Sequence, residues 1–182
     1  MNNKYKLSKL TVVCLTALVL NACTALVVGG VAAGATSGAA VASDPRSSSG
    51  VFDDQGLRSK VADAINATIP GNNVEVTSYD KNILLTGQVL TNDNKLKAEQ
   101  MTRQVPNVNK VYNQIEIGAS QSASQTSKDA YLTSVIKSNM LFSKGVSSND
   151  VKVVTSNGTV YLMGMIDPYQ AKKMTQAARE VD

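Results

Sequence analysis

Few residues of this 182-residue chain have types that could do chemistry on their own. It contains two cysteines and no histidine or tryptophan, and no serine lies in a nucleophile-elbow pattern. These absences leave no histidine-activated nucleophile. The adjacent carboxylates Asp53 and Asp54 could suggest acid–base work, but acids just ahead of an apolar helical pattern are more typical of helix N-caps. We therefore predict a non-catalytic protein with neither metal nor cofactor.

Cys23 is the cysteine whose preceding residues point to a chemical role. It ends the run Leu20-Asn21-Ala22-Cys23. Ahead of it lie three lysines and a short apolar run that is too brief to span a bilayer, the pattern of a signal peptide over residues 1–22. The run resembles the bacterial lipobox, although Asn21 replaces the usual small residue. We predict that Cys23 becomes the N-terminus and carries covalent acyl chains, palmitate among them. The alternative is an ordinary signal peptide with a free cysteine.

The charge of the chain argues weakly against nucleic acid as a partner. The 18 basic and 14 acidic residues give a net charge of +4, but three of the lysines lie in residues 1–22. Removal of that segment leaves 15 basic against 14 acidic residues, a net charge of +1. A nearly neutral chain lacks the basic excess that phosphate backbones require.

One short stretch occurs twice and organises the rest of the chain. Ile83–Val89 returns as Val160–Ile166, and each copy follows a pair of alternating valines at the same spacing. Alternation of apolar and other residues is typical of half-buried strands, and Asn157-Gly158 is a strong hairpin signal. Gly87 and Gly164 fall at the same point of each copy. We interpret them as structural glycines beneath a closely crossing helix, with a β-bulge as the alternative.

Helical patterns surround both hairpins and define two units. In the first, a helix begins near Asp53, a second runs from about Thr91 to Gln104, and a strand follows over 108–117. In the second, Asp129 is expected to cap a helix, and Asp167 with Pro168 to start another. No strand follows the last helix, so we expect the second unit to be C-terminally incomplete. The predicted layout is 1–22 signal peptide, 23–52 lipidated cysteine and small-residue tether, 53–118 first domain, 119–127 linker and 128–182 second domain.

These features together resemble a known family. The lipobox, the tether containing Asp44-Pro45-Arg46, and the matches at 111–113 and 157–164 are similar to outer-membrane lipoproteins with two BON domains, the DolP family. The resemblance implies an α/β sandwich in each domain, a three-stranded sheet under two helices in the order helix-strand-strand-helix-strand. It also implies a lipid-anchored protein of the outer membrane that faces the periplasm. It further implies binding of anionic phospholipid, support of outer-membrane integrity and a link to the division site.

The residues themselves favour one helix for lipid contact. The segment 53–69 has a net charge of −1, whereas the matched segment 128–144 has +2 and adds Tyr131 and Phe142. Basic residues beside an aromatic ring suit an anionic bilayer surface. The predicted lipid-binding residues are Lys128, Tyr131, Leu132 and Lys137. The alternative is that the apolar members are core and the lysines merely solvated.

A protein-binding role is the second hypothesis. The first unit or an exposed sheet edge could dock partners in envelope assembly or cell-wall remodelling, because a strand edge presents unpaired backbone groups. The sequence does not name such a partner. Vesicle binding by the region from residue 44 onward separates the two hypotheses.

Overall fold

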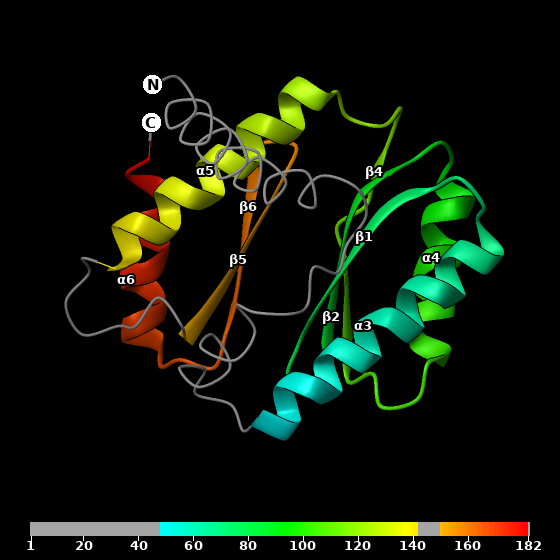
Figure 1. The fold of residues 1–182 in the computed structure, drawn as a ribbon, viewed down its shortest axis with the longest axis horizontal. Helices are drawn as coiled ribbons and strands as arrows, with labels where there is room; N and C mark the ends of the chain where they lie inside the picture. Colours follow the sequence, from blue (N-terminus) through cyan, green and yellow to red (C-terminus); the bar gives the residue numbers. More distant parts are fainter. Residues whose placement is uncertain (1–47, 142–149, 182) are drawn as a thin grey trace, which may run out of the picture. The chain divides into compact units, whose positions relative to one another are not determined.

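The computed structural model describes residues 48–141 and 150–181, and the predicted signal peptide, Cys23 and most of the tether lie outside them. The first domain contains α3 (Ser48–Thr68), β1 (Asn73–Tyr79), β2 (Asn82–Val89), α4 (Asn92–Gln104), β3 (Lys110–Asn113) and β4 (Glu116–Ile117). The second contains α5 (Ala123–Leu141), β5 (Val151–Ser156), β6 (Thr159–Gly164) and α6 (Pro168–Arg179) (Figure 1). Each domain is the predicted combination of two helices with a sheet.

In the first domain, β2 is the central strand. It pairs antiparallel with β1 on one side, and in parallel with β3 and then β4 on the other. The helices α3 and α4 pack against each other and against this sheet. Leu57, Val61 and Ile65 of α3 meet Ile83 and Leu85 of β2 in a closed apolar core, as the helical and alternating patterns predict.

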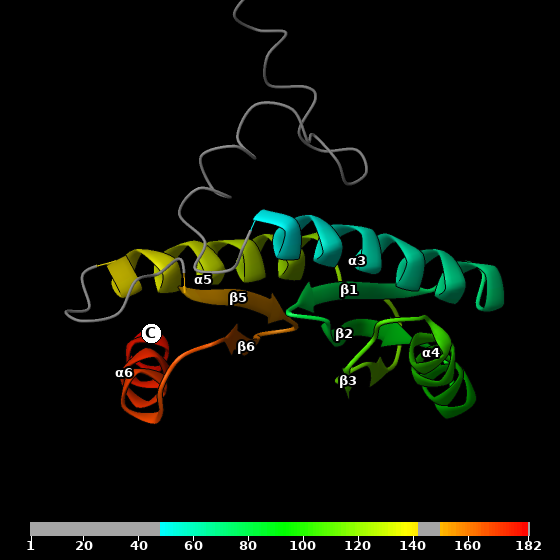
Figure 2. The same cartoon turned by 90° about the horizontal axis from the view of Figure 1, so that it is seen from below.

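The second domain repeats this plan around a two-stranded sheet. β5 pairs antiparallel with β6 (Figure 2). Val151 and Val153 of β5 pack against Ile136 and Met140 of α5 and against Met174 of α6. Among the described residues no strand lies on the second edge of β6. The consequence is visible in burial, because seven of the eight residues of β2 are buried whereas those of β6 are half-buried or exposed.

Both hairpin turns form as the sequence predicts. Asp80 and Lys81 in the first turn, and Asn157 and Gly158 in the second, all have φ between 49° and 77°. Two consecutive positive φ values fit the turn type that matches the twist of a hairpin. The less suitable pair Asp80-Lys81 therefore adopts the conformation that Asn157-Gly158 adopts more readily.

A buried carboxylate from the preceding helix holds each turn. Asp54 accepts hydrogen bonds from the backbone N–H groups of Asp80 and Lys81, at 2.7 and 2.8 Å, and from the Ser78 hydroxyl at 2.6 Å. Asp129 accepts from the backbone N–H groups of Asn157 and Gly158 at 2.7 and 2.9 Å. The two aspartates thus tie helix to hairpin in the same way in each domain.

Two predicted helix starts are wrong. α3 begins at Ser48, inside the predicted tether, and α5 begins at Ala123, inside the predicted linker 119–127. Asp53, Asp54 and Asp129 therefore lie within helices and are not N-caps. At α6 the prediction is confirmed: Asp167 caps the helix through Gln170 N–H at 2.8 Å, in a reciprocal capping box with Pro168 in the first turn.

The predicted third strand of the first domain is interrupted. It forms as β3 and β4 with a break at Gln114 and Ile115, and the Gln114 N–H donates to Leu85 O at 2.9 Å across that break. Ile115 is buried, whereas Ile117 is 55% exposed. The strand still covers the second edge of β2, which closes the first sheet on that side.

Candidate membrane-binding surface

The predicted lipid-contact residues lie on α5, and the structure separates the core positions from the surface positions. Ile136 and Met140 are at most 1% exposed and belong to the core. Tyr131 is 66% exposed, and Lys128 and Lys137 are exposed as well. Leu132 is half-buried between the two groups. The alternative that Tyr131 is a core residue is therefore wrong, while Phe142 and Lys144 lie outside the described residues.

Asp54 and Asp129 hold the hairpins of the two domains, and aligning α5 with α3 on these aspartates gives each surface residue of α5 a counterpart in α3. With Asp129 placed on Asp54, Lys128 falls on Asp53, and Tyr131 falls on Gly56. Lys137 falls on Ala62 in the same frame, and the buried Ile136 falls on the buried Val61. The buried Val61 and Ile136 thus agree between the helices. Two exposed positions change from an acid and a glycine to a lysine and a tyrosine, and the half-buried Ala62 is replaced by the exposed Lys137.

This surface exposes two lysines and a tyrosine, residue types that suit an anionic bilayer surface. Tyrosine places an apolar ring at the headgroup level of a bilayer while its hydroxyl stays hydrated. The single acid of this part of α5, Asp129, is 4% exposed and held by the hairpin. The exposed charges of α5 within the described residues are consequently both positive.

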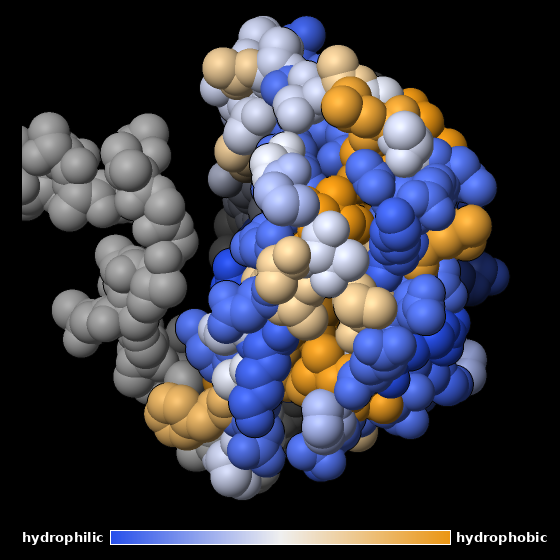
Figure 3. Space-filling view, turned by 90° about the vertical axis from the view of Figure 1, so that its right-hand side faces the viewer, coloured by the Kyte–Doolittle hydropathy of each residue, from blue (hydrophilic) through white to orange (hydrophobic). Residues whose placement is uncertain are grey.

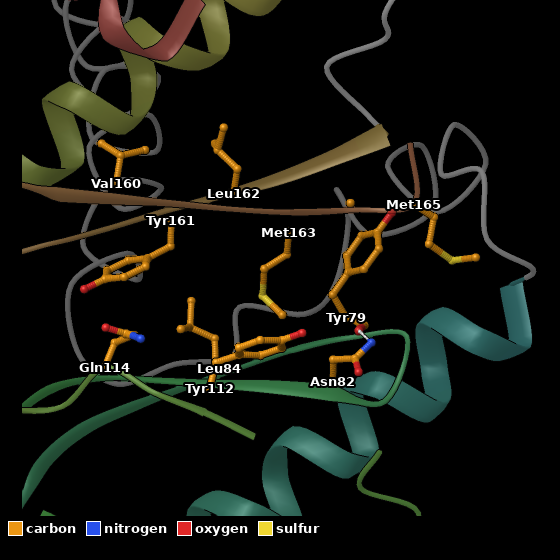
Figure 4. Close-up of a pocket in the computed structure, with 11 residues that line it drawn as sticks. Tyr79, Asn82, Leu84, Tyr112, Gln114, Val160, Tyr161, Leu162, Met163 and Met165 are labelled. Carbon is orange, nitrogen blue, oxygen red and sulfur yellow. Dashed lines mark hydrogen bonds between the residues drawn. The ribbon is translucent and has the colours of Figure 1, made fainter. Parts of the chain in front are cut away.

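A cleft between the two domains was not predicted. It has a volume of about 430 Å³ and is lined from the first domain by Tyr79, Leu84 and Tyr112, and from the second by six consecutive residues of the β6 region. Figure 4 shows Tyr161 and Met163 pointing toward the first domain, with Val160 and Leu162 on the opposite side of the strand. Burial, with the charge of Glu116, raises the pKa of the Tyr161 hydroxyl. The sequence pattern did not predict this cleft, because the residues of its two walls are distant in the chain.

Hydrogen bonds between described residues of the two domains lie beside the cleft. The Tyr79 hydroxyl donates to Asp150 O at 3.1 Å, and the Lys152 ammonium donates to Ser78 O at 3.4 Å. The Asn157 side-chain amide donates to a Glu116 carboxylate oxygen at 2.6 Å. The hairpin of each domain therefore contacts the other domain as well as its own helix.

The first domain exposes both apolar and basic groups. Figure 3 shows several separate apolar areas among hydrophilic side chains on the face turned to the viewer. Its exposed large apolar residues are Phe52, Leu90, Leu96, Tyr112 and Ile117. They are spread over α3, α4, the strands and the residue after β2, and the exposed Lys110 lies two residues from Tyr112 on β3.

The described residues contain no helix long and apolar enough to cross a membrane. They also contain no group of three or more metal-ligating side chains. The atoms nearest to a Cβ added at Gly87 belong to β1, and those nearest to one added at Gly164 belong to Asp150 and Val151 at the start of β5, so none of them comes from a helix. The expectation of a crossing helix is wrong for both glycines.

Comparison with known proteins gives a consistent picture. The BON domain matches residues 53–119 and 128–182. The chain is 36% identical over 178 residues to the outer membrane lipoprotein DolP of Haemophilus influenzae, covering 96% of this chain and 90% of that protein. It is 33% identical over 141 residues to the 21 kDa hemolysin of Actinobacillus pleuropneumoniae, covering 76% of this chain and 73% of that protein.

Proposed function

We propose a function from the premise that this chain belongs to the BON domain family of DolP-like proteins. The proposal is that its second domain binds anionic phospholipid at a membrane surface. The observation that carries the proposal is Tyr131, 66% exposed on α5 with Lys128 and Lys137 exposed on the same helix. In this role the protein is a non-catalytic component of the cell envelope that supports outer-membrane integrity. The resemblance to DolP extends the proposal to the division site.

The expected binding is weak and electrostatic. Each lysine close to an anionic surface contributes about 1 kcal/mol, and salt screens the attraction within about 10 Å at 0.1 M. Two lysines and one interfacial ring therefore give reversible association that depends on salt and discriminates anionic from zwitterionic lipid. A second attachment makes such weak contact effective, because a tethered surface meets the bilayer at high local concentration.

Tyr131→Glu is expected to abolish binding to anionic vesicles without unfolding the protein. The change places a negative charge where the ring enters the headgroup layer, and the exposed site makes no core contact. The measurement is co-sedimentation of residues 44–182, which contain every described element, with vesicles of phosphatidylglycerol and phosphatidylcholine. Circular dichroism checks the fold.

The matched control is Gly56→Glu, at the counterpart position of α3. A side chain there meets nothing within 4 Å, and the net charge changes by the same amount. Loss of binding by Tyr131→Glu with normal binding by Gly56→Glu supports the proposal. Equal loss by both variants would show that net charge alone governs binding, and normal binding by both would remove α5 as the contact.

Attachment to the outer membrane is proposed through acyl chains on Cys23. Anchors with more than one chain hold a protein stably where a single chain is marginal. Cys23→Ala is expected to give a form that takes up no labelled palmitate and leaves the membrane fraction. Incorporation of label by this variant, with sedimentation alongside outer membranes, would contradict the lipobox assignment and the periplasm-facing location with it.

One observation favours the second hypothesis, that the protein binds a protein partner. The second edge of β6, beside the cleft, pairs with no strand among the described residues. On β2 the matching edge receives β3 and β4 in parallel, with Lys81 O and Val89 O as acceptors from Asn109 and Gly118 at 2.8 and 2.9 Å. The counterpart acceptors are the carbonyls of Gly158 and Ile166. An extended strand running parallel to β6 fits this edge, and it becomes the leading explanation if vesicles of no composition bind the protein.

A further inference from the structure

The tip of the second hairpin carries the sole Asn-Gly pair of the chain, Asn157-Gly158, and both residues are exposed. Their φ angles of 49° and 77° lie in the left-handed region that the turn requires. Asn-Gly is also a dipeptide prone to spontaneous deamidation, because glycine has no Cβ to keep its backbone nitrogen away from the preceding side chain. The two residues that suit this turn are therefore chemically labile.

Deamidation of this pair is an intramolecular substitution followed by hydrolysis. The backbone nitrogen of Gly158 gives up its proton to solvent and bonds to Cγ of Asn157, while the side-chain nitrogen takes a proton from water and leaves as ammonia. Water then opens the cyclic imide. Attack at Cγ leaves an aspartate, and attack at the main-chain carbonyl leaves an isoaspartate, whose main chain is one carbon longer. Nothing is oxidised or reduced, and water is the only co-reactant.

The fold restrains the nucleophile of this reaction. The Gly158 N–H donates to Asp129 Oδ1 at 2.9 Å, and the Asn157 N–H donates to Asp129 Oδ2 at 2.7 Å. The substitution needs the Gly158 nitrogen as an anion, and a neighbouring carboxylate disfavours a second negative charge. Because Asp129 is 4% exposed, little water screens this repulsion. Asp129 therefore suppresses the first step while it holds the turn.

The first domain holds the carbon that would be attacked. The Asn157 side chain donates from Nδ2 to Glu116 Oε2 of β4 at 2.6 Å. A carboxylate only accepts, so this bond also fixes which atom of the carboxamide is the nitrogen. Closure of the imide ring requires rotation of the side chain and of the backbone of Asn157. The hydrogen bonds to Glu116 and Asp129 oppose both rotations.

The first hairpin shows that the turn can form without the labile pair. Asp80-Lys81 takes the place of Asn157-Gly158, with φ of 50° and 61°, and donates to Asp54 in the same manner at 2.7 and 2.8 Å. An aspartate, one product of deamidation, is therefore compatible with this turn. What the product loses is the hydrogen bond to Glu116, because two carboxylates then face each other.

We propose that Asn157 is a site of spontaneous deamidation, suppressed in the folded protein by Asp129 and Glu116, whose modification removes the contact of the second hairpin tip with the first domain. The reaction proceeds when the hairpin opens, because opening releases both the nucleophile and the carboxamide. Neither product has an amide donor for Glu116. A transient opening of the hairpin is thereby converted into a lasting loss of this contact.

The test compares deamidation rates in folded and unfolded protein. Residues 44–182 are kept at mildly alkaline pH in native buffer and in urea, and the peptide containing Asn157 is followed by mass spectrometry, with enzymatic methylation of isoaspartate as a second readout. The folded protein should react at least about tenfold more slowly, which corresponds to an opening free energy of about 1.4 kcal/mol. Equal rates in the two solutions would overturn the proposal.

Glu116→Ala should accelerate the reaction in native buffer and leave the rate in urea unchanged. The matched control is Glu75→Ala, which removes an exposed acid from β1 of the same sheet and should react as the parent does. A Glu116→Ala rate no faster than that of the parent, or equal acceleration by both variants, contradicts the protective role of Glu116.

The consequence of modification is tested with a variant that carries the aspartate product. Asn157→Asp should lower the urea midpoint of the second domain. Adding Glu116→Gln supplies an amide donor from the opposite side of the contact and should restore most of the midpoint, because the donor and acceptor have only exchanged places. A double variant no more stable than Asn157→Asp alone would show that the loss does not arise at Glu116 and would overturn the proposed consequence.

Discussion

Asp129→Ala is expected to unfold the second domain under conditions in which the parent domain is folded. The Asp129 carboxylate is 4% exposed and accepts from both turn N–H groups of the β5–β6 hairpin, at 2.7 and 2.9 Å, and from the Gln125 amide at 2.9 Å. Hydrogen bonds to a charged acceptor contribute about 1.5 to 3 kcal/mol each, and partly buried donors left without a partner add a desolvation penalty. A loss of roughly 3 to 5 kcal/mol is comparable with the whole stability of a small domain.

The measurement is urea unfolding of residues 44–182 followed by circular dichroism. Asp53→Ala is the matched control, because Asp53 is an exposed helical aspartate that holds no turn, and it should change the free energy of unfolding little. Asp54→Ala should destabilise the first domain as Asp129→Ala does the second. A loss below about 1 kcal/mol at Asp129 would contradict its role in holding the hairpin.

Gly87→Ala is expected to destabilise the first domain by about 3 to 5 kcal/mol, the second large effect. Gly87 has φ +93°, which an L side chain rarely adopts, and an added Cβ would lie 2.0 Å from the backbone oxygen of Asn73. Asn73 belongs to β1, the strand paired with β2, so relief requires a shift of the sheet itself. Left-handed backbone costs roughly 1 to 2 kcal/mol for a non-glycine residue, and overpacking typically adds 1 to 3.

Gly164→Ala provides the comparison within the same chain. Its added Cβ would meet Asp150 O at 2.7 Å and a methyl group of Val151 at 3.0 Å, without a positive φ. The loss of stability should therefore be smaller than at Gly87, while Gly164→Val should clash more severely. Thermal midpoints of both alanine variants measure the difference. Equal midpoints would show that the backbone conformation at Gly87 carries no cost.

The sequence predicted the elements whose signals are local. Asn157-Gly158 marked a turn because both residues tolerate positive φ, and Asp167 with Pro168 marked a helix start because capping acts within one turn of helix. The alternation around Ile83 and the helical spacing around Val61 likewise follow from burying one face of a regular element. These predictions depend on neighbours in the chain, and the structure confirms them.

The misplaced predictions concern residues whose partners are distant in the chain. Asp54 and Asp129 have the residue type of an N-cap, yet each serves a hairpin that lies more than twenty residues away. Gly87 is required by the carbonyl of Asn73 across the sheet, which no local pattern reveals. Sequence reasoning placed the glycines correctly but assigned them the wrong neighbour.

For the candidate membrane-binding surface too, some features follow from the sequence and others only from the tertiary structure. The sequence by itself determined which helix gathers lysines and an extra tyrosine, because charge and residue type can be counted along the chain. Only the tertiary structure decided that Tyr131 faces outward and that Asp129 is withdrawn from the surface. The physical reason is that exposure and ion pairing are fixed when helices pack on a sheet, which selects one face of each helix for the core and leaves the other for a partner.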